Sequence, residues 1–286
     1  MGLEQQEIQW NGCTTEYDTL SQVIVCEPTY MKIEEVINTV QKRYAEDNID
    51  VTKALKQHKA FTDTLKQQGI EVISLPAKSE FPEQVFTRDI GFTIGTRVFI
   101  SEMASPIRQG EEKVLREWVG TKGIPFQKMT AGSIEGGDVV IDGNRVFVGV
   151  SHRTNHEAIT FLEKQLPGYE VIRVPFDASC LHLDCVFTIV SPTHALIYPD
   201  ALSQEARNIL KKHYTLMTVE KEEQFAMGTN VLAIGDGKII SLPQNKLVNN
   251  KLRSNGFDVI EIDFSEIIKS GGSFRCCTMP LTRTPE

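Results

Sequence analysis

A repeat with a period close to 46 residues is the feature that most constrains the fold of this 286-residue chain. A fixed period in this range is typical of repeated supersecondary units. The units are therefore expected to be similar in structure and to surround a common axis. One polar or sulfur-bearing residue stands at the equivalent point of each unit, at intervals of 49, 46, 46 and 46 residues: Asp89, Asp138, Asp184, Asn230 and Cys276.

Each unit combines an amphipathic helix, a short apolar strand and a two-stranded run with a turn signal in its middle. The helices are expected at 51–69, 111–123, 155–168, 203–213 and 245–256. The strands that follow them are expected at 70–76, 124–130, 169–175, 214–220 and 257–263. The two-stranded runs are expected at 88–101, 137–150, 183–198 and 229–242.

The fifth unit lacks a second strand after Cys276, whereas the apolar run at 20–28 has no helix before it. We expect this N-terminal strand to complete the fifth unit and to leave few sheet edges exposed. The sequence thus predicts one domain over residues 1–286, a five-bladed, pseudo-symmetric α/β propeller closed by the N-terminal strand. On periodicity alone, an ordinary parallel α/β sheet is the alternative.

Composition excludes several classes of protein. The net charge is −8 and no Lys/Arg-rich block occurs, which argues against nucleic-acid binding. No apolar run approaches the roughly 18–20 residues that span a bilayer, and "MGLEQQEIQW" has neither the basic nor the apolar region of a secretion signal. The expectation is a cytoplasmic protein with free thiols and no membrane partner. A homodimer is compatible with the sequence.

Two of the six cysteines are adjacent, in "GGSFRCCTMPL" at 271–281. They could be metal ligands, a redox pair, or a nucleophile with a bystander. The chain contains no CxxC, so a zinc ribbon or a thioredoxin-type motif is disfavoured.

Loops that enter the equivalent strands are expected to meet near the axis. This end would gather Asp89, Glu135 of "SIEGGDV", and Cys276. It would also gather His182 and Asp184 of "CLHLDCVFT", which share one face if the segment is extended. Several carboxylates around a thiol suggest a cationic substrate whose charge favours the thiolate, while histidine moves the proton.

Structural alternatives stay open for each of these residues. A turn before a strand accounts for "EGGD", a satisfied core histidine for His182, and an internal ion pair for Arg88 beside Asp89. A zinc site built on cysteine and histidine also stays open.

Taken together, "FTRD", "EGGD", "FVGVSHRTN", "HLD" and "GGSFRCCTMPL" resemble the guanidino-group-modifying enzymes, in this order and across nearly the whole chain. That superfamily contains arginine deiminases, amidinotransferases and dimethylarginine dimethylaminohydrolases, all five-bladed α/β propellers. Chain length, "SPIRQGEE", "FVGVSHRTN" and "CCT" look most like the dimethylarginine dimethylaminohydrolases.

The resemblance implies that Cys276 is the nucleophile and His182 the general acid/base. It places Glu135 and Asp89 at the substrate guanidinium. Cys277 is expected to pack as a small, inert apolar side chain.

The resemblance also implies that Arg108 and Arg153 hold the substrate α-carboxylate, for which a bidentate arginine is suited. Their structural alternatives are a helix-start residue and a surface cation. Asp184 departs from the dimethylarginine enzymes, which usually have a basic residue two positions after the histidine. In deiminases and amidinotransferases, both aspartates grip an unsubstituted guanidinium, so Asp184 puts a methylated substrate in doubt.

The expected activity is hydrolysis of a guanidino C–N bond of arginine or a methylated arginine. A covalent thiouronium intermediate would give citrulline and an amine or ammonia. The small-molecule guanidino substrate is the expected partner, with no cofactor and no metal. The alternatives are an arginine deiminase-like or amidinotransferase activity on unsubstituted guanidines and, in a different class, a non-catalytic binding protein of the same fold.

Overall fold

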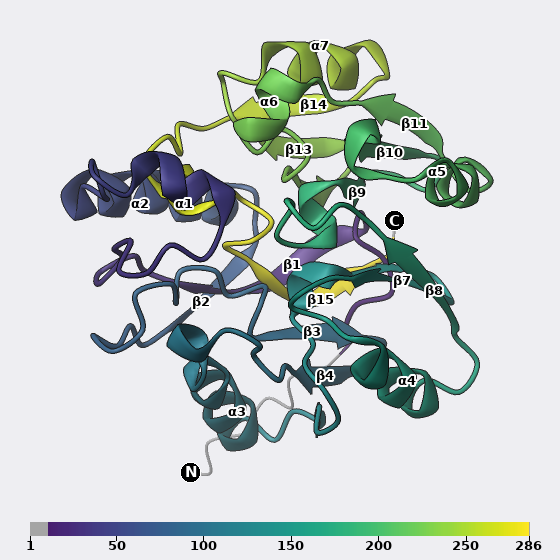
Figure 1. Ribbon diagram of the computed structural model, residues 1–286, viewed down its shortest axis with the longest axis horizontal. Coiled ribbons are helices and arrows are strands. Elements are labelled where there is room, and N and C mark those ends of the chain that lie inside the picture. Colours follow the sequence, from purple (N-terminus) through teal and green to yellow (C-terminus); the bar gives the residue numbers. More distant parts are fainter. Residues whose placement is uncertain (1–10, 286) are drawn as a thin grey trace, which may run out of the picture.

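A computed structural model of the chain describes residues 11–285, and it contains five three-stranded sheets arranged around the middle of the molecule (Figure 1). The expectation about a secretion signal concerns residues 1–10, which lie outside the described residues. In four of the sheets, the three strands are consecutive in the sequence. These sheets are β3 (Gly91–Ile94), β4 (Arg97–Ile100) and β5 (Phe126–Lys128); β6 (Val139–Asp142), β7 (Arg145–Val150) and β8 (Glu170–Pro175); β9 (Phe187–Ile189), β10 (His194–Ile197) and β11 (Thr215–Thr218); and β12 (Leu232–Gly235), β13 (Lys238–Ser241) and β14 (Asp258–Glu261).

Every one of these sheets has the same topology. Its first two strands are antiparallel, and its second and third strands are parallel. A parallel connection needs a crossover, which a helix supplies in each case. The predicted repeat of a helix, a strand and a strand pair is confirmed, but each sheet combines a strand pair with the helix and strand that follow it rather than with those that precede it.

The fifth sheet joins segments from opposite ends of the described chain. Strand β15 (Met279–Thr284) pairs antiparallel with β1 (Thr19–Cys26), which pairs parallel with β2 (Glu71–Leu75). The prediction that the N-terminal strand completes the fifth unit is confirmed. Within residues 11–285, the sheets remain separate and no sheet closes on itself.

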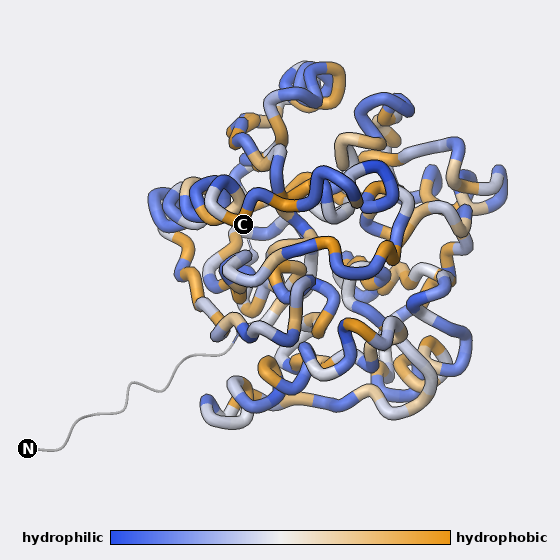
Figure 2. The backbone as a smooth tube through the Cα atoms, turned by 60° about the vertical axis from the view of Figure 1, so that its left-hand side comes forward, coloured by the Kyte–Doolittle hydropathy of each residue, from blue (hydrophilic) through white to orange (hydrophobic). Residues whose placement is uncertain are grey.

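The helices lie outside the sheets, and hydrophilic and hydrophobic residues alternate along them (Figures 1 and 2). Five correspond to the expected helices: α2 (Val51–Gln67), α3 (Glu111–Thr121), α4 (His156–Gln165), α5 (Gln204–Lys211) and α7 (Lys246–Ser254). Two short ones, α1 (Thr39–Tyr44) and α6 (Lys221–Phe225), were not expected. No helix in the described part is long and apolar enough to cross a membrane.

Five hydrophobic clusters lie between the sheets, and each cluster draws on two neighbouring sheets. One packs Val23 and Val25 of β1 against Leu232 and Ile234 of β12, which joins the sheet nearest the C-terminus to the sheet that contains the N-terminal strand. The other four clusters join the remaining neighbours in chain order. Since each sheet buries both faces in this way, the apolar character of the strands is explained.

An aromatic group of three rings supports the cysteine segment. Phe61 of α2 lies 5.4 Å from Phe264 and 5.1 Å from Phe274, measured between ring centroids. Phe264 and Phe274 stack at 4.6 Å. Because Phe274 precedes Cys276 by two residues, the packing of α2 helps to fix the cysteine in place.

Replacing Phe61 with alanine removes a fully buried ring from this group. We expect the free energy of unfolding to fall by about 3–5 kcal/mol, because a large cavity replaces the ring. Urea denaturation followed by circular dichroism measures the change. Phe126→Ala is the matched control, since Phe126 is 41% exposed and its loss should cost little. Equal losses in the two variants would contradict the role of the group.

Candidate active site

The site lies where the loops before the first strands of the sheets meet. Glu135 and His182 both have extended backbones, and each is followed by a 3₁₀ turn, η2 (Gly136–Asp138) or η3 (Leu183–Cys185). The expectation that His182 and Asp184 share one face of an extended segment is wrong, because Asp184 lies within η3. The turn separates them: His182 bonds to Glu135, whereas Asp184 bonds to Arg275.

The glycines of "EGGD" are required by close packing. A Cβ atom on Gly137 would lie 2.7 Å from His182 Nδ1 and 2.8 Å from Asp89 Oδ1. Real Cβ atoms do not approach other atoms so closely. Gly137 therefore makes the space in which the imidazole and the Asp89 carboxylate come together.

Hydrogen bonds link the equivalent points of the five repeats in a circle. Each bond joins one equivalent residue, or a residue within two positions of it, to the neighbouring repeat. The bonds are Arg88 N to Cys276 O (3.0 Å), Gly136 N to Asp89 O (3.2 Å), Leu183 N to Asp138 Oδ1 (2.8 Å), Asn230 Nδ2 to Asp184 O (3.5 Å) and Cys276 N to Asn230 Oδ1 (3.1 Å).

His182 is fully buried between two carboxylates. Its Nε2 lies 2.7 Å from Glu135 Oε2, and its Nδ1 lies 3.5 Å from Asp89 Oδ1. Burial by itself lowers the pKa of His182, but Asp89, Glu135 and Asp138 outweigh it and raise the pKa to about 9. The imidazole is therefore protonated at neutral pH and can act as an acid.

Both arginines assigned to the substrate carboxylate are buried, so neither is a surface cation. Arg108 Nη1 lies 2.5 Å from Asp89, and its other nitrogens bond to Glu111 at 2.8–3.3 Å. Arg153 Nη1 lies 3.2 Å from Glu135. In this structure both guanidinium groups neutralise carboxylates of the site.

The Cys276 side chain is 3% exposed and faces Asp184 and Asn230. Its sulfur lies 3.5 Å from Asp184 Oδ2 and 3.1 Å from Asn230 Nδ2. Burial, and then Asp184, raise the pKa of Cys276 well above its usual value. The raised pKa favours the neutral thiol over the thiolate in this structure.

Cys277 lies in the hydrophobic cluster beside β1 with no exposed surface, as expected. All six cysteines are free. The expected free thiols are therefore confirmed.

The structure thus brings together all seven residues singled out from the sequence, through direct contacts or through the pocket that Asp89, Arg108, His182 and Cys276 line. It also adds four buried residues that the sequence analysis did not place in the site. These are Glu16, Glu83, Asn230 and Arg275.

Arg275 and Glu16 support Asp184 from behind. Arg275 Nη1 lies 2.7 Å from Asp184, and its Nη2 lies 3.1 Å from Glu16 and 3.0 Å from the carbonyl of Val139. Glu16 also pairs with Arg88 at 3.5 Å. Arg88 therefore forms an internal ion pair, which the sequence analysis gave as the alternative to a functional role. In the sequence, only the position of Arg275 next to Cys276 could have indicated that it supports the site.

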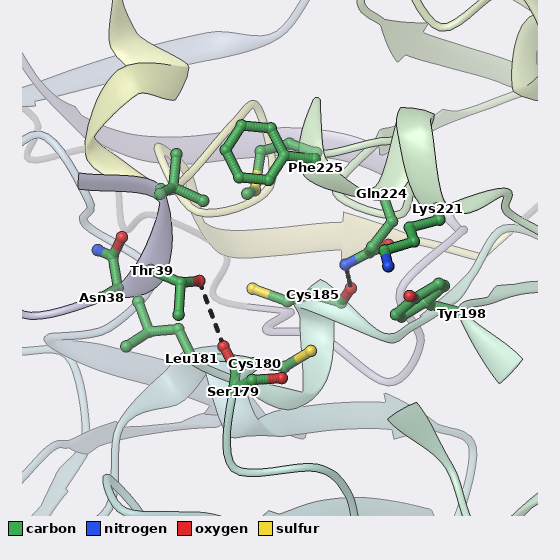
Figure 3. A pocket seen from close by; sticks show the side chains of 13 residues that line it. Asn38, Thr39, Ser179, Cys180, Leu181, Cys185, Tyr198, Lys221, Gln224 and Phe225 are labelled. Carbon is green, nitrogen blue, oxygen red and sulfur yellow. Dashed lines mark hydrogen bonds between the residues drawn. The ribbon is translucent and has the colours of Figure 1, made fainter. Parts of the chain in front are cut away.

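Two cavities meet at this site. The candidate catalytic pocket, lined by Asp89, Arg108, His182 and Cys276, is narrow in this structure, with a free volume of about 10 Å³. A second cavity of about 180 Å³ shares Asn38, Leu181 and Gly271 with it. Figure 3 shows Cys180 and Cys185 in this side cavity, with Tyr198 and Lys221 to one side of them.

Asp89, Glu135 and His182 bring three ligand atoms within 4.8 Å of one another, a grouping that could hold a metal ion. In this structure Glu135 pairs with both His182 and Arg153, and Asp89 pairs with Arg108. These arginines would have to move away before a divalent cation could enter.

We therefore expect purified protein to contain no stoichiometric metal. Elemental analysis by mass spectrometry checks this on wild type, Cys276→Ser and His194→Ala, whose histidine lies outside the site. Stoichiometric zinc that is lost in Cys276→Ser and kept in His194→Ala would establish a metal site instead.

Glu83 is a second buried acid of the catalytic pocket. It accepts hydrogen bonds from Gln41 at 2.7 Å and from Ser270 at 3.0 Å. Burial raises the pKa of Glu83 to about 7, although Arg108 opposes the change. Between pH 4.5 and 7, the unfolded chain has released this proton while the folded chain retains it.

The contribution of Glu83 to stability is therefore expected to fall as pH rises from 4.5 to 7, and Glu83→Gln removes this contribution. The unfolding free energy of the variant relative to wild type should increase by about 3 kcal/mol over this range, by linkage. Urea titrations at several pH values measure it. Glu80→Gln, at an exposed neighbouring position, is the control. A pH-independent difference for Glu83→Gln would contradict the prediction.

Comparison with known families now identifies the chain's relatives. The family described as "N,N dimethylarginine dimethylhydrolase, eukaryotic" matches residues 27–283. The chain belongs to this family. Its resemblance to the guanidino-group-modifying enzymes is thereby confirmed.

Several curated relatives match most of the chain, including one from Bacillus subtilis and one from Mycobacterium tuberculosis. "Uncharacterized protein YkgA" of Bacillus subtilis is 52% identical over 95% of each chain. The N(G),N(G)-dimethylarginine dimethylaminohydrolase of Mycobacterium tuberculosis is 27% identical over 89% of this chain and 83% of its own. Among solved structures, the N-terminal domain of ArgZ, a cyanobacterial arginine dihydrolase, has a TM-score of 0.85 at 24% identity and covers 93% of this chain and 98% of that one. It shows that the fold is shared.

Proposed function

We propose that this protein is a cysteine hydrolase that cleaves a guanidino C–N bond. One observation carries the proposal: a buried thiol and a protonated histidine line one pocket with Asp89, and the carboxylates of Glu135 and Asp184 lie 2.7 Å from His182 and 3.5 Å from Cys276. Carboxylates compensate a bound cation, and a bound cation favours the thiolate. A non-catalytic binding protein would need neither the thiol nor the histidine.

In the first step, Cys276 releases its thiol proton to solvent as the cationic substrate binds, and the thiolate attacks the guanidinium carbon of a substrate held by Asp89, Asp184 and Glu135. A carbon–sulfur bond forms and one carbon–nitrogen bond breaks. His182 gives its proton to the departing nitrogen, which its raised pKa supports. The S-alkylthiouronium remains on the cysteine.

In the second step, His182 takes a proton from water, and the water oxygen replaces the sulfur on carbon. The sulfur takes a proton back from the carbon-bound hydroxyl when it is released. The products are a ureido compound, such as citrulline from arginine, and ammonia or an amine. His182 and the cysteine return to their starting states. The chain's own residues supply every group in this sequence, so the proposal needs no cofactor.

The substrate we favour carries an unsubstituted guanidinium, as arginine does. Asp184 lies 3.5 Å from the nucleophilic sulfur and is held there by Arg275. It offers a hydrogen-bond acceptor at a nitrogen that methyl groups would occupy in a methylated substrate. The solved relative with arginine dihydrolase activity acts on the same amino acid. We place the α-carboxylate near Arg153 and Arg108.

Methylated arginine is the second candidate, because the family that contains the chain is described by that substrate. Transfer of the amidino group to an amine is the third outcome.

We also infer that the five sheets stand as the blades of a closed, single-domain propeller. The hydrophobic clusters between successive sheets and the circle of hydrogen bonds at the equivalent residues support this arrangement. We propose a cytoplasmic location and leave the oligomeric state to solution measurement.

The test is product formation from arginine, mono- and dimethylarginine, and agmatine. We expect arginine to yield citrulline and ammonia, with dimethylarginine turned over at least about tenfold more slowly, the effect of a lost hydrogen bond to a charged group. Chromatography of products measures both. Cys276→Ser should abolish turnover, and Cys277→Ser should retain it as the matched control.

Activity that survives in Cys276→Ser would refute the covalent mechanism. Faster turnover of dimethylarginine would favour the second candidate and show that Asp184 does not exclude methyl groups.

A further inference from the structure

Of the five equivalent residues of the repeat, Asn230 alone has no part in the proposed mechanism. Asp89, Asp184 and Cys276 act in that mechanism, and Asp138 holds the segment of His182 through the Leu183 amide. Asn230 is fully buried, in the loop before β12. Its side chain touches the nucleophile directly.

The orientation of the Asn230 amide follows from its backbone partners. Oδ1 accepts hydrogen bonds from the backbone N–H of Ser273 at 3.2 Å and of Cys276 at 3.1 Å. Two N–H donors can face only the oxygen, so the nitrogen must face the other way. Nδ2 therefore points at Cys276 Sγ, 3.1 Å away.

Burial is the largest cause of the raised pKa of the Cys276 thiol, and nearby acidic groups add to it, although the cations Arg108 and His182 line the same pocket. Asp184, Asp89, Cys185 and Cys277 each raise its pKa. Within residues 11–285, Asn230 Nδ2 is the one donor whose hydrogen bond ends on this sulfur. A hydrogen bond donated to the charged form of a group stabilises that form.

We propose that Asn230 is a further catalytic residue, whose Nδ2–H group stabilises and aims the Cys276 thiolate formed when a cation enters the pocket. Nδ2 also lies 3.5 Å from the Asp184 carbonyl, which adds a contact that favours this orientation of the amide. Its oxygen meanwhile holds the cysteine segment through two backbone amides. The same side chain thus fixes the position of the nucleophile and lowers the cost of its negative charge.

Asn230→Asp separates these two roles. The aspartate has the same shape and retains an oxygen for the amides of Ser273 and Cys276. It replaces the donor that faces the sulfur with an acceptor. Asn230→Ser is the second variant, since it removes the amide without placing a negative charge beside the thiol.

The primary measurement is alkylation of Cys276, which needs no substrate and therefore does not depend on the proposed function. Iodoacetamide, a neutral reagent, and 2-chloroacetamidine, a cationic one, are reacted with full-length protein between pH 6 and 10. Mass spectrometry of the peptide that contains Cys276 gives the rate. We expect both variants to react roughly 10- to 100-fold more slowly near pH 7, the size of one hydrogen bond to a charged group.

Asn249→Asp is the matched control. Asn249 is also a buried amide, but it bonds to Ser241 and to the Leu242 carbonyl, away from the cysteine. In Asn249→Asp, Cys276 should be alkylated at the wild-type rate, even if the substitution lowers the free energy of unfolding. Circular dichroism and urea denaturation establish that each variant is folded.

Turnover of arginine supplies the second readout. If the proposed function holds, kcat should fall in Asn230→Asp by about the factor seen in alkylation, with KM changed far less. A chain that hydrolyses no guanidine would refute the proposed function, while alkylation still decides the role of Asn230. The role of Asn230 would be overturned if both variants are folded and their Cys276 is alkylated at the wild-type rate with the wild-type pH dependence.

Discussion

The circle of hydrogen bonds at the equivalent residues is the constraint on which the site depends. Each bond joins one repeat to the next, and the backbone of Cys276 takes part in two of them, through Asn230 and through Arg88. A residue in such a circle cannot move without disturbing both neighbours. The side chains of the site are consequently held by backbone geometry contributed from all five repeats.

Charge compensation is the second requirement. Asp89, Glu135, Asp184 and Glu16 are buried close to one another, which is costly unless cations accompany them. Arg108, Arg153, Arg275 and Arg88 supply the positive charge, each through an ion pair of 3.5 Å or less. The result is a site whose buried carboxylates are each neutralised by an arginine of the chain itself.

The repeat in the sequence predicted the sheets, the main helices and the pairing of the N-terminal strand, because 46-residue spacing and strand alternation are local signals. It also predicted which polar residues meet. The 3₁₀ turn at Leu183–Cys185 escaped prediction, since an apolar run after His182 reads equally well as a strand. Glu16 and Arg275 escaped because their pairing joins residues that lie far apart in sequence, and no spacing rule connects them. Asn230 was found by its position, but only the structure shows which of its amide atoms faces the sulfur.

The pairing of β1 with β15 also has a consequence for how the protein is made. These two strands lie more than 250 residues apart, so the sheet that follows the Cys276 segment is completed by pairing between opposite ends of the described chain. Such contacts form late, because a large loop must be closed before they stabilise anything. During synthesis the other four sheets can assemble before β15 is made, whereas the fifth sheet can form only after β15 has emerged. We therefore expect the segment of Cys276, which leads into β15, to take its final place late in folding.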